Sequence, residues 1–333
     1  MRFELGQRII DKLRKPFIRV KWREVVKEID IKFKLKEFID VYNDLLCDDY
    51  SKETYLNVLQ YRLNHHFKLK SALQTPSNEM CENIKVKNGK EFELSNGWKF
   101  SEINLAPLGI DLRFYGDPTS IYSVTEQYSY NIGEIDIDIK DKDIVIDGGG
   151  CYGDTALWFA HKVGENGKVY SFEFINENLK IFKESLNLNP KLKDRIKILK
   201  NALYSNSGSD LYVYENGPGT FCSMEKLDCN LYGGGGELST IKTKAIDDLI
   251  KEERLERVDF IKMDIEGSEL AALKGARNTI QQYKPNLAIC IYHKIEDFYM
   301  IPKYIKEIVP EYKLYVKHHT DMEWETVLYA SVK

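Results

Sequence analysis

Two acidic residues flank a glycine-rich segment within residues 144–155, near the middle of the chain, in a pattern typical of a nucleotide-binding turn. Asp147 ends a β-branched apolar run, Gly149 and Gly153 follow it, and Asp154 opens a second apolar pattern. This order predicts a buried strand, a tight turn and the start of a helix. Because glycine has no side chain, such a turn lets a ligand approach the backbone at the carboxyl end of the strand.

The charges around this turn indicate which ligand it suits. Residues 148–153 match the dinucleotide fingerprint Gly-x-Gly-x-x-Gly, and Glu173 lies twenty residues beyond its last glycine, so an NAD-dependent oxidoreductase is one hypothesis. A pyrophosphate needs unopposed N–H groups and the positive end of a helix, and Asp147 and Asp154 oppose it there. The two carboxylates suit S-adenosylmethionine, which carries a sulfonium and an ammonium group but no phosphate.

Several segments resemble the FkbM-type class I S-adenosylmethionine-dependent methyltransferases in order and spacing. The stretch Asp147-x-Gly149-x-x-x-Gly153 is similar to the first motif of class I methyltransferases. The most specific part of the resemblance is Lys-x-Asp-x-Glu-Gly-x-Glu at residues 262–269. The resemblance covers about residues 120–331 and includes three further segments: 169–173, 201–203 and 325–330.

The chain departs from the family pattern in two places. Many relatives have a proline soon after the acid that matches Glu173, where this chain has Phe174-Ile175-Asn176. Many also have an acid two positions before the histidine that matches His293, where this chain has Ile291. The first departure hardly affects cofactor binding, and the second leaves the catalytic detail open.

Strands and helices alternate after residue 143, which predicts a parallel sheet with helices on both faces. The last two strands are joined by the short linker 318–321 and are expected to be antiparallel. The fold class expected is α/β, a Rossmann-like, doubly wound, mostly parallel seven-stranded sheet with one antiparallel strand. Beyond the strand before the glycine turn, strands are expected at 168–173, 196–200, 258–263, 286–292, 312–317 and 325–331, and helices at 154–163, 176–188, 268–282 and 297–309.

Three regions are expected along the chain. Residues 1–83 have helical periodicity and form an N-terminal helical accessory region, 84–142 form a β-rich connecting segment that lines the site, and 143–333 form the S-adenosylmethionine-binding methyltransferase domain. Within 201–250 the sequence is less regular, and four consecutive glycines at 233–236 suit either a mobile flap or a surface turn.

The resemblance implies a set of cofactor contacts at the strand ends. Glu173 is expected to accept hydrogen bonds from both ribose hydroxyls, since a carboxylate takes two donors at once. Gly149 and Gly153 would let the backbone approach the methionyl part. Asp147 would hold the ammonium group directly or through water, with Glu126 a weaker candidate for the same task. Two residues that end the third strand are expected to flank the adenine: Asn201 and Ala202.

The candidate catalytic residues are Asp264, Glu266 and His293, which follow the fourth and fifth strands of the expected sheet. A hydroxyl is a poor nucleophile until its proton is removed, and His293 could be the base, oriented by Asp264 or Glu266. Alternatively, the three residues could bind a divalent cation that lowers the pKa of the hydroxyl. We favour the metal-free interpretation. Glu269, near the start of the next helix, is interpreted as a cap or an internal salt bridge.

Composition narrows the class of protein. The net charge of -4 and the lack of a basic stripe in the catalytic region argue against a nucleic-acid substrate, and no apolar run is long enough for a transmembrane segment. Six scattered cysteines suit reduced thiols and a cytoplasmic location. Basic residues in 1–23 alternate with apolar ones, so this stretch is expected to be an amphipathic helix. We favour packing on the protein itself over a peripheral membrane or partner contact.

These observations predict an S-adenosylmethionine-dependent O-methyltransferase that acts on a small molecule. The resemblance implies a sugar hydroxyl of a surface polysaccharide or of its nucleotide-linked precursor. Two alternatives remain at this stage, an NAD-dependent oxidoreductase and a non-catalytic cofactor-binding module. The sequence is also compatible with a homo-oligomer.

Overall fold

The computed structural model of the protein describes residues 34–63, 69, 76–95, 97–214, 221–223 and 238–333. The expected basic helix at 1–23 and the glycines at 233–236 lie outside these ranges. Within the described ranges, every helix is too short or too polar to cross a lipid bilayer.

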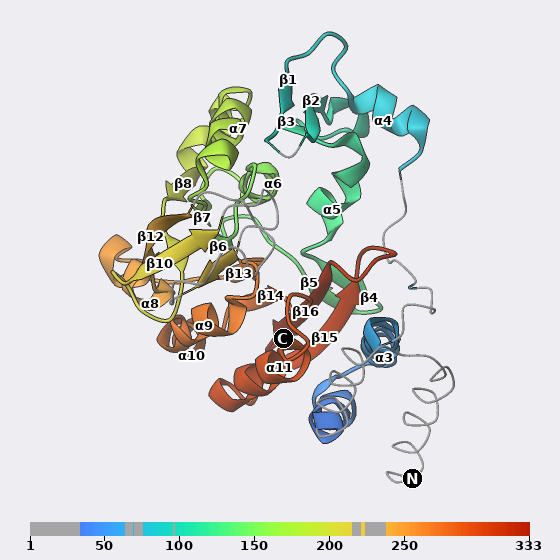
Figure 1. Ribbon diagram of the computed structural model, residues 1–333, viewed down its shortest axis with the longest axis vertical. Coiled ribbons are helices and arrows are strands. Elements are labelled where there is room, and N and C mark those ends of the chain that lie inside the picture. Colours follow the sequence, from blue (N-terminus) through green and yellow to red (C-terminus); the bar gives the residue numbers. More distant parts are fainter. Residues whose placement is uncertain (1–33, 64–68, 70–75, 96, 215–220, 224–237) are drawn as a thin grey trace.

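A seven-stranded sheet forms the centre of the molecule (Figure 1). Its order is β15-β16-β14-β13-β6-β7-β8, and β16 is antiparallel to both of its neighbours while all other pairings are parallel. This confirms the expected fold class and the antiparallel last pair. The strands are β6 (Ile144–Gly148), β7 (Lys168–Phe172), β8 (Ile196–Leu199), β13 (Phe260–Met263), β14 (Asn286–Cys290), β15 (Lys313–His318) and β16 (Thr326–Ser331).

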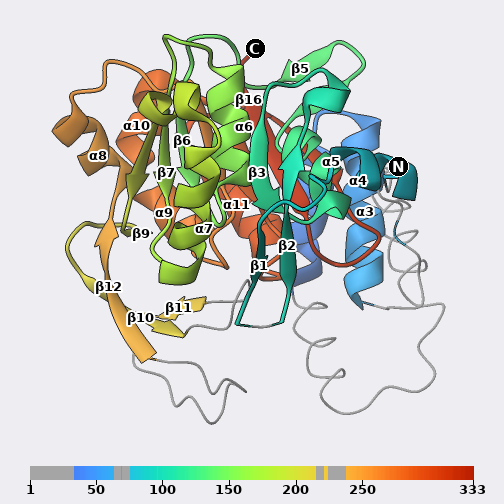
Figure 2. The same ribbon diagram turned by 90° about the horizontal axis from the view of Figure 1, so that it is seen from above.

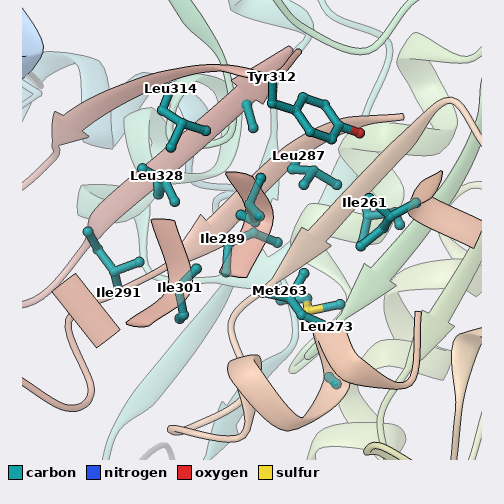
Figure 3. Packing of buried hydrophobic residues seen from close by; sticks show 14 of the residues in the cluster. Ile261, Met263, Leu273, Leu287, Ile289, Ile291, Ile301, Tyr312, Leu314 and Leu328 are labelled. Carbon is teal, nitrogen blue, oxygen red and sulfur yellow. The ribbon is translucent and has the colours of Figure 1, made fainter. Parts of the chain in front are cut away.

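Each central strand is buried on both faces, which explains its nearly continuous apolar sequence. In β14, Leu287 and Ile289 belong to one buried cluster, while Ala288 and Cys290 belong to the cluster on the opposite face. Figure 3 shows Leu287 and Ile289 among apolar side chains of the neighbouring strands. The alternation follows from the two-residue period of a strand.

Helices cover both faces of the sheet (Figure 1). The helices α6 (Asp154–Lys162) and α7 (Asn176–Asn187) pack on one face. The other face is covered by α8 (Ile246–Glu253), α9 (Glu269–Lys274), α10 (Arg277–Tyr283) and α11 (Asp297–Ile308). The expectation of one continuous helix at 268–282 is wrong. The chain breaks at Gly275, where an added Cβ would lie 2.2 Å from the carbonyl oxygen of Tyr204.

The described N-terminal helices cover the edge strand β15. Residues 34–40 are helical and lead into a π-helical turn (Val41–Leu45), and α3 (Asp49–Leu63) follows. Leu46 pairs with Leu314, and the Val316 N–H donates to Ser51 Oγ at 2.8 Å. These contacts satisfy backbone groups that an open sheet edge would expose. The helices share the main core, and the domain boundary at residue 83 stays a prediction.

The segment that precedes the main sheet contains, in its described residues, five short strands and one α-helix. It begins after α4 (Asn78–Ile84) with a three-stranded antiparallel sheet, β1 (Glu91–Glu93), β2 (Lys99–Asn104) and β3 (Arg113–Gly116). It continues with α5 (Ile121–Glu126) and the hairpin of β4 (Tyr130–Ile132) and β5 (Ile135–Ile137). The Tyr115 N–H donates to Ser185 Oγ at 3.0 Å and so fixes β3 on α7.

A second, four-stranded sheet occupies the region that the sequence marks as irregular. It has the order β11-β10-β12-β9, with β9 (Ala202–Leu203), β10 (Asp210–Tyr214), β11 (Phe221–Ser223) and β12 (Leu238–Lys244). Figure 2 shows β10 and β12 projecting away from the main sheet.

Candidate active site

A cavity of about 270 Å³ opens at the carboxyl ends of the central strands, the edge at which open α/β sheets bind their ligands. Six of the ten predicted site residues line it, namely Gly149, Glu173, Asn201, Ala202, Asp264 and Glu266. The other four, Asp147, Gly153, Glu126 and His293, do not. Two residues without a predicted role, Tyr292 and Glu325, also line the cavity.

Glu173 follows β7 and is held in place by donors at both oxygens of its carboxylate. Its Oε1 accepts from the N–H groups of Phe174 and Ile175 at 2.6 Å, and its Oε2 accepts from Asn178 Nδ2 at 3.1 Å. Burial raises the pKa of Glu173 to about 7, against the opposing effect of these donors. Because the carboxylate also lines the cavity, its remaining lone pair, on Oε2, suits a further hydroxyl donor.

Asp147 does not face the cavity, and its expected contact with the cofactor ammonium group needs correction. The side chain is fully buried, lies 3.1 Å from Lys262 Nζ and accepts from Ser171 Oγ at 2.7 Å. Its strand explains this orientation. Asp147 has the same parity in β6 as Val145, which packs in the cluster under α6. The carboxylate therefore supports the glycine turn from within.

The two glycines of the turn are needed for internal packing. A Cβ on Gly149 would lie 2.0 Å from the Asp264 carbonyl oxygen, and a Cβ on Gly153 would lie 2.1 Å from the Phe182 ring. Their φ angles are +86° and +87°, a region that residues with a side chain disfavour. Gly149 borders the cavity, whereas Gly153 begins α6 against Phe182 and lies outside the cavity lining.

Glu126 is exposed at the end of α5 and does not line the cavity, so it is withdrawn as a candidate for the ammonium group. The two residues after it turn into the protein instead. Gln127 Nε2 donates to Glu325, and Tyr128 Oη donates to Asp264 Oδ2 at 3.0 Å. The connecting segment therefore reaches the site through these two side chains.

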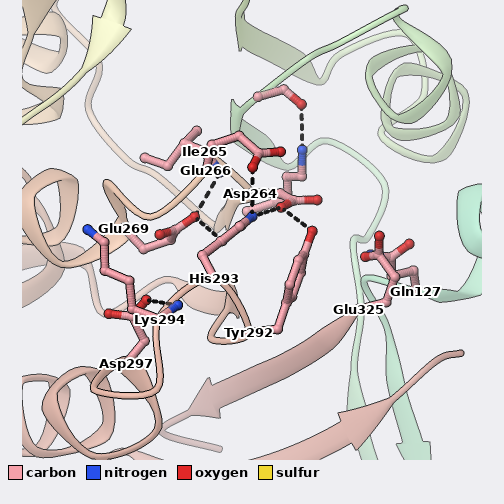
Figure 4. Close-up of polar contacts among 12 residues, drawn as sticks. Gln127, Asp264, Ile265, Glu266, Glu269, Tyr292, His293, Lys294, Asp297 and Glu325 are labelled. Carbon is pink, nitrogen blue, oxygen red and sulfur yellow. Dashed lines mark hydrogen bonds and ion pairs between the residues drawn. The ribbon is translucent and has the colours of Figure 1, made fainter. Parts of the chain in front are cut away.

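Asp264 lies at the centre of the polar cluster (Figure 4). It also accepts a hydrogen bond from Tyr292 Oη at 2.9 Å. Burial would raise the pKa of Asp264, but the positive charges of His293 and Lys262 and the two tyrosine hydroxyls outweigh it and lower the pKa. Asp264 is therefore a carboxylate at neutral pH, and it brings negative charge to the wall of the cavity.

His293 lies behind the cavity wall, among three acids. Its Nε2 is 3.5 Å from Asp264 Oδ1 and 3.6 Å from Glu266 Oε2, and its Nδ1 is 3.0 Å from Glu269 Oε1. Burial opposes the charged imidazolium, yet the three carboxylates raise the pKa of His293 to about 9. Figure 4 shows the ring between the acids.

This geometry opposes the interpretation of His293 as the base, because an imidazolium at neutral pH has no free nitrogen to accept a proton. The position of Glu269 beside His293 agrees with its interpretation as a partner in an internal salt bridge. Glu269 also accepts a hydrogen bond from the Ile265 N–H at 2.8 Å. Protonated His293 and Lys262 are two cations that balance neighbouring carboxylates. The metal-free interpretation stays a prediction.

Sequence reasoning gave no role to four residues that build the site: Gln127, Lys262, Tyr292 and Glu325. Lys262 and Glu325 belong to the segments that carried the family resemblance, so a signal for them was present. Glu325 has φ +65°, an uncommon conformation for a residue other than glycine and one that occurs at functional sites. Gln127 reaches the site only through tertiary packing, which no local sequence pattern reveals.

Comparison with known proteins agrees with the fold and with the resemblance. The pattern of the methyltransferase FkbM domain matches residues 147–314, slightly more than half of the chain. No curated protein is significantly similar to the chain in sequence. A methyltransferase FkbM from Methylobacillus flagellatus KT has a similar structure, with a TM-score of 0.57 and 24% identity. The match covers 91% of this chain and 60% of that protein, so this chain spans less than two thirds of its length.

More distant structures include fibrillarin from Aeropyrum pernix with bound S-adenosyl-L-methionine, with a TM-score of 0.38, 12% identity and coverage of 78% of this chain and 99% of that one. An S-adenosylmethionine-dependent O-methyltransferase from Thermotoga maritima has a TM-score of 0.34, 14% identity and coverage of 79% and 84%. The domain match over residues 147–314 shows that the chain belongs to the FkbM family of S-adenosylmethionine-dependent methyltransferases.

Proposed function

We propose that the protein transfers the methyl group of S-adenosylmethionine to a hydroxyl of a small molecule, and that the acceptor is a sugar of a surface polysaccharide or of its nucleotide-linked precursor. The observation that carries the proposal is that Glu173, Ala202 and Asp264 line one cavity. This set combines a buried carboxylate for a ribose, an apolar contact for a base and an ionised acid for a sulfonium.

The order of the strands supports this arrangement. Neighbouring strands lie about 4.8 Å apart. The strand order β8-β7-β6-β13-β14-β16 therefore sets the order in which the residues that line the cavity follow one another along the edge of the sheet. Asn201 and Ala202 after β8 would flank the adenine, Glu173 after β7 would bind the ribose, and Gly149 after β6 would lie under the methionyl part. The sulfonium then lies near Asp264 after β13, and the acceptor lies over β14 and β16.

S-adenosylmethionine, when bound, supplies a methyl group that is already activated on a positively charged sulfur. The protein therefore has to align the acceptor hydroxyl with that methyl group and keep water away. On the acceptor side, Tyr292 offers a hydroxyl, and Glu266 and Glu325 offer carboxylates. Such groups suit a ligand that is rich in hydroxyls, which supports a sugar as the acceptor class.

Incubation with methyl-labelled S-adenosylmethionine and a panel of nucleotide sugars and oligosaccharides tests this function. Label should appear on a sugar hydroxyl. Glu173→Ala should weaken the binding of S-adenosylhomocysteine in calorimetry by about 10- to 100-fold, because hydrogen bonds to a charged group contribute about 1.5–3 kcal/mol. The matched control is Glu165→Ala, an exposed acid in the turn before β7. Binding of NAD in preference to S-adenosylhomocysteine would overturn the proposal.

A further inference from the structure

Glu325 lies at the acceptor end of the cavity and comes from outside the matched family domain. It immediately precedes β16, on the far side of β14 from Asp264, and it lines the cavity together with Tyr292. The domain match ends at residue 314, so Glu325 and its partner Gln127 lie outside the matched residues, although both fall within the wider resemblance over about residues 120–331. The side chain is partly exposed. Because it lines the cavity, its exposed atoms face the ligand space.

The carboxylate of Glu325 has few partners compared with the other acids of the cavity. Among the described residues, the Gln127 amide is the hydrogen-bond donor to its side chain, at Oε2. Glu173 has three donors, and Asp264 has the hydroxyls of two tyrosines. Glu325 thus retains an oxygen, Oε1, that is available to an incoming hydroxyl.

The alternative bases of the site are less suitable. His293 is protonated, as its three carboxylate neighbours require. Burial raises the pKa of Glu266 to about 7 against the opposing charge of His293, but its side chain is 40% exposed, so water competes with an acceptor hydroxyl for its carboxylate. Asp264 keeps a low pKa and is held by two hydroxyls. An acid that is to accept a proton needs a raised pKa and a place from which water is excluded.

We propose that Glu325 is the group that takes the proton from the acceptor hydroxyl during methyl transfer. As the O–H bond breaks, the proton passes to a carboxylate oxygen of Glu325, and the acceptor oxygen forms its new bond to the methyl carbon. The electron pair of the broken S–C bond stays on sulfur, which becomes neutral. The products are a methyl ether, a thioether and a protonated Glu325.

The charges around Glu325 agree with this role. Burial and the charge of Asp264 raise its pKa, while His293, the Gln127 amide and Lys262 oppose the rise. The other titratable groups of the surrounding elements, Tyr128, Tyr292 and Cys290, have pKa values raised by burial and are neutral at physiological pH. A bound sulfonium would add positive charge beside Glu325 and so favour the carboxylate that accepts the proton.

This inference rests on the proposed function, but it has a test that needs no acceptor. S-adenosylmethionine and S-adenosylhomocysteine differ in the sulfonium charge. Calorimetry at pH 8 in two buffers of different ionisation enthalpy measures the protons released on binding each of them. The wild type should release more protons with S-adenosylmethionine, because the sulfonium lowers the pKa of Glu325. Glu325→Gln should lose this excess, and Asp321→Asn, an exposed acid in the same loop, should keep it.

Unchanged affinity for S-adenosylhomocysteine shows that the Gln variant is folded. With an acceptor identified from the sugar panel, Glu325→Gln should reduce kcat by about 100-fold or more and flatten its rise with pH. Excess proton release that persists in Glu325→Gln, or is missing in the wild type, overturns the inference. If no sugar is methylated, the proposed acceptor class fails, while the proton measurement still decides whether Glu325 lies beside the sulfonium.

Discussion

Lys262 Nζ lies 3.1 Å from Asp147 Oδ1, and neither side chain exposes more than 2% of its surface. The same ammonium group donates to the Gly149 carbonyl oxygen at 2.7 Å and lies 5.1 Å from the centre of the Tyr128 ring. One buried cation therefore joins β13, the glycine turn and the connecting segment. Both charges lie beneath the cofactor cavity, where they fix the turn.

Lys262→Met should destabilise the protein by about 3–5 kcal/mol, because it leaves the carboxylate of Asp147 buried without its cation. Urea unfolding measures the effect. The double variant Lys262→Met, Asp147→Leu should recover much of the loss, since it removes both charges. Lys197→Met is the matched control. Its ion pair with Glu253, 2.7 Å long, is exposed and screened by water. Equal losses in Lys262→Met and Lys197→Met would contradict this role.

Gly149→Ala should prevent the turn from closing, because its Cβ would meet the Asp264 carbonyl at 2.0 Å. Gly208 gives a matched control. It has φ +85°, against +86° at Gly149, but no atom lies within 4 Å of its added Cβ. Gly208→Ala should therefore show the cost of the left-handed backbone alone, about 1–2 kcal/mol. Gly149→Ala should cost several kcal/mol more in urea unfolding and abolish binding of S-adenosylhomocysteine. Similar losses in both variants would show that the clash is relieved cheaply.

The sequence predicted the main sheet because each strand has a local signal, an apolar run followed by an acid or a turn. Glu173 and Asp264 were placed correctly at the sheet edge for the same reason, since a residue that follows a parallel strand must lie there. The two-residue period of β6 also predicts the direction of the Asp147 side chain, which points to the same face as the buried Val145.

The contact between Gln127 and Glu325 had no such local signal. The two residues are 198 positions apart and meet only because the connecting segment packs against β16. The pKa of His293 was likewise not predictable. It depends on three carboxylates that follow β13, and a histidine at a strand end looks the same in the sequence whether it is neutral or charged. The charges that the fold brings around His293 decide whether its ring is a neutral base or a cation.

His293 should make stability depend on pH in a defined window. Its folded pKa of about 9 lies above the ordinary value of 6.5, so its contribution is fully present below about pH 6.5 and is lost as the pH rises through 9. The difference in unfolding free energy between wild type and His293→Asn should therefore be largest at low pH, up to about 3 kcal/mol. NMR of ¹⁵N-labelled histidine should show one ring that titrates near 9.

His161 is the internal control for this measurement, because burial lowers the pKa of that ring. It should titrate below 6.5 in both proteins. A wild-type spectrum in which no histidine titrates above 7 would contradict the picture of an imidazolium held by Asp264, Glu266 and Glu269.

Arg62 links the N-terminal helices to the loop that follows β14. It donates from α3 to the Tyr292 carbonyl oxygen and packs 5.5 Å from the centre of the Phe298 ring, while Tyr55 Oη donates to the Phe298 carbonyl at 2.9 Å. These contacts hold the loop between β14 and α11, which carries Tyr292 and His293. The helices therefore act on the site through the backbone of this loop, although none of their described side chains lines the cavity.

Arg62→Met should lower stability by about 1.5–3 kcal/mol, the contribution of a hydrogen bond to a charged donor. It should also shift the NMR titration of His293, because the loop can then move relative to the carboxylates that follow β13. The affinity for S-adenosylhomocysteine should change little, since Glu173 and Asn201 follow β7 and β8, which are separated from β14 by β6 and β13 in the sheet. Glu53→Ala, an exposed acid on the same helix, is the control and should alter none of the three. If Arg62→Met is less stable but the titration of His293 is unchanged, α3 covers the edge of the sheet and does not act on the site.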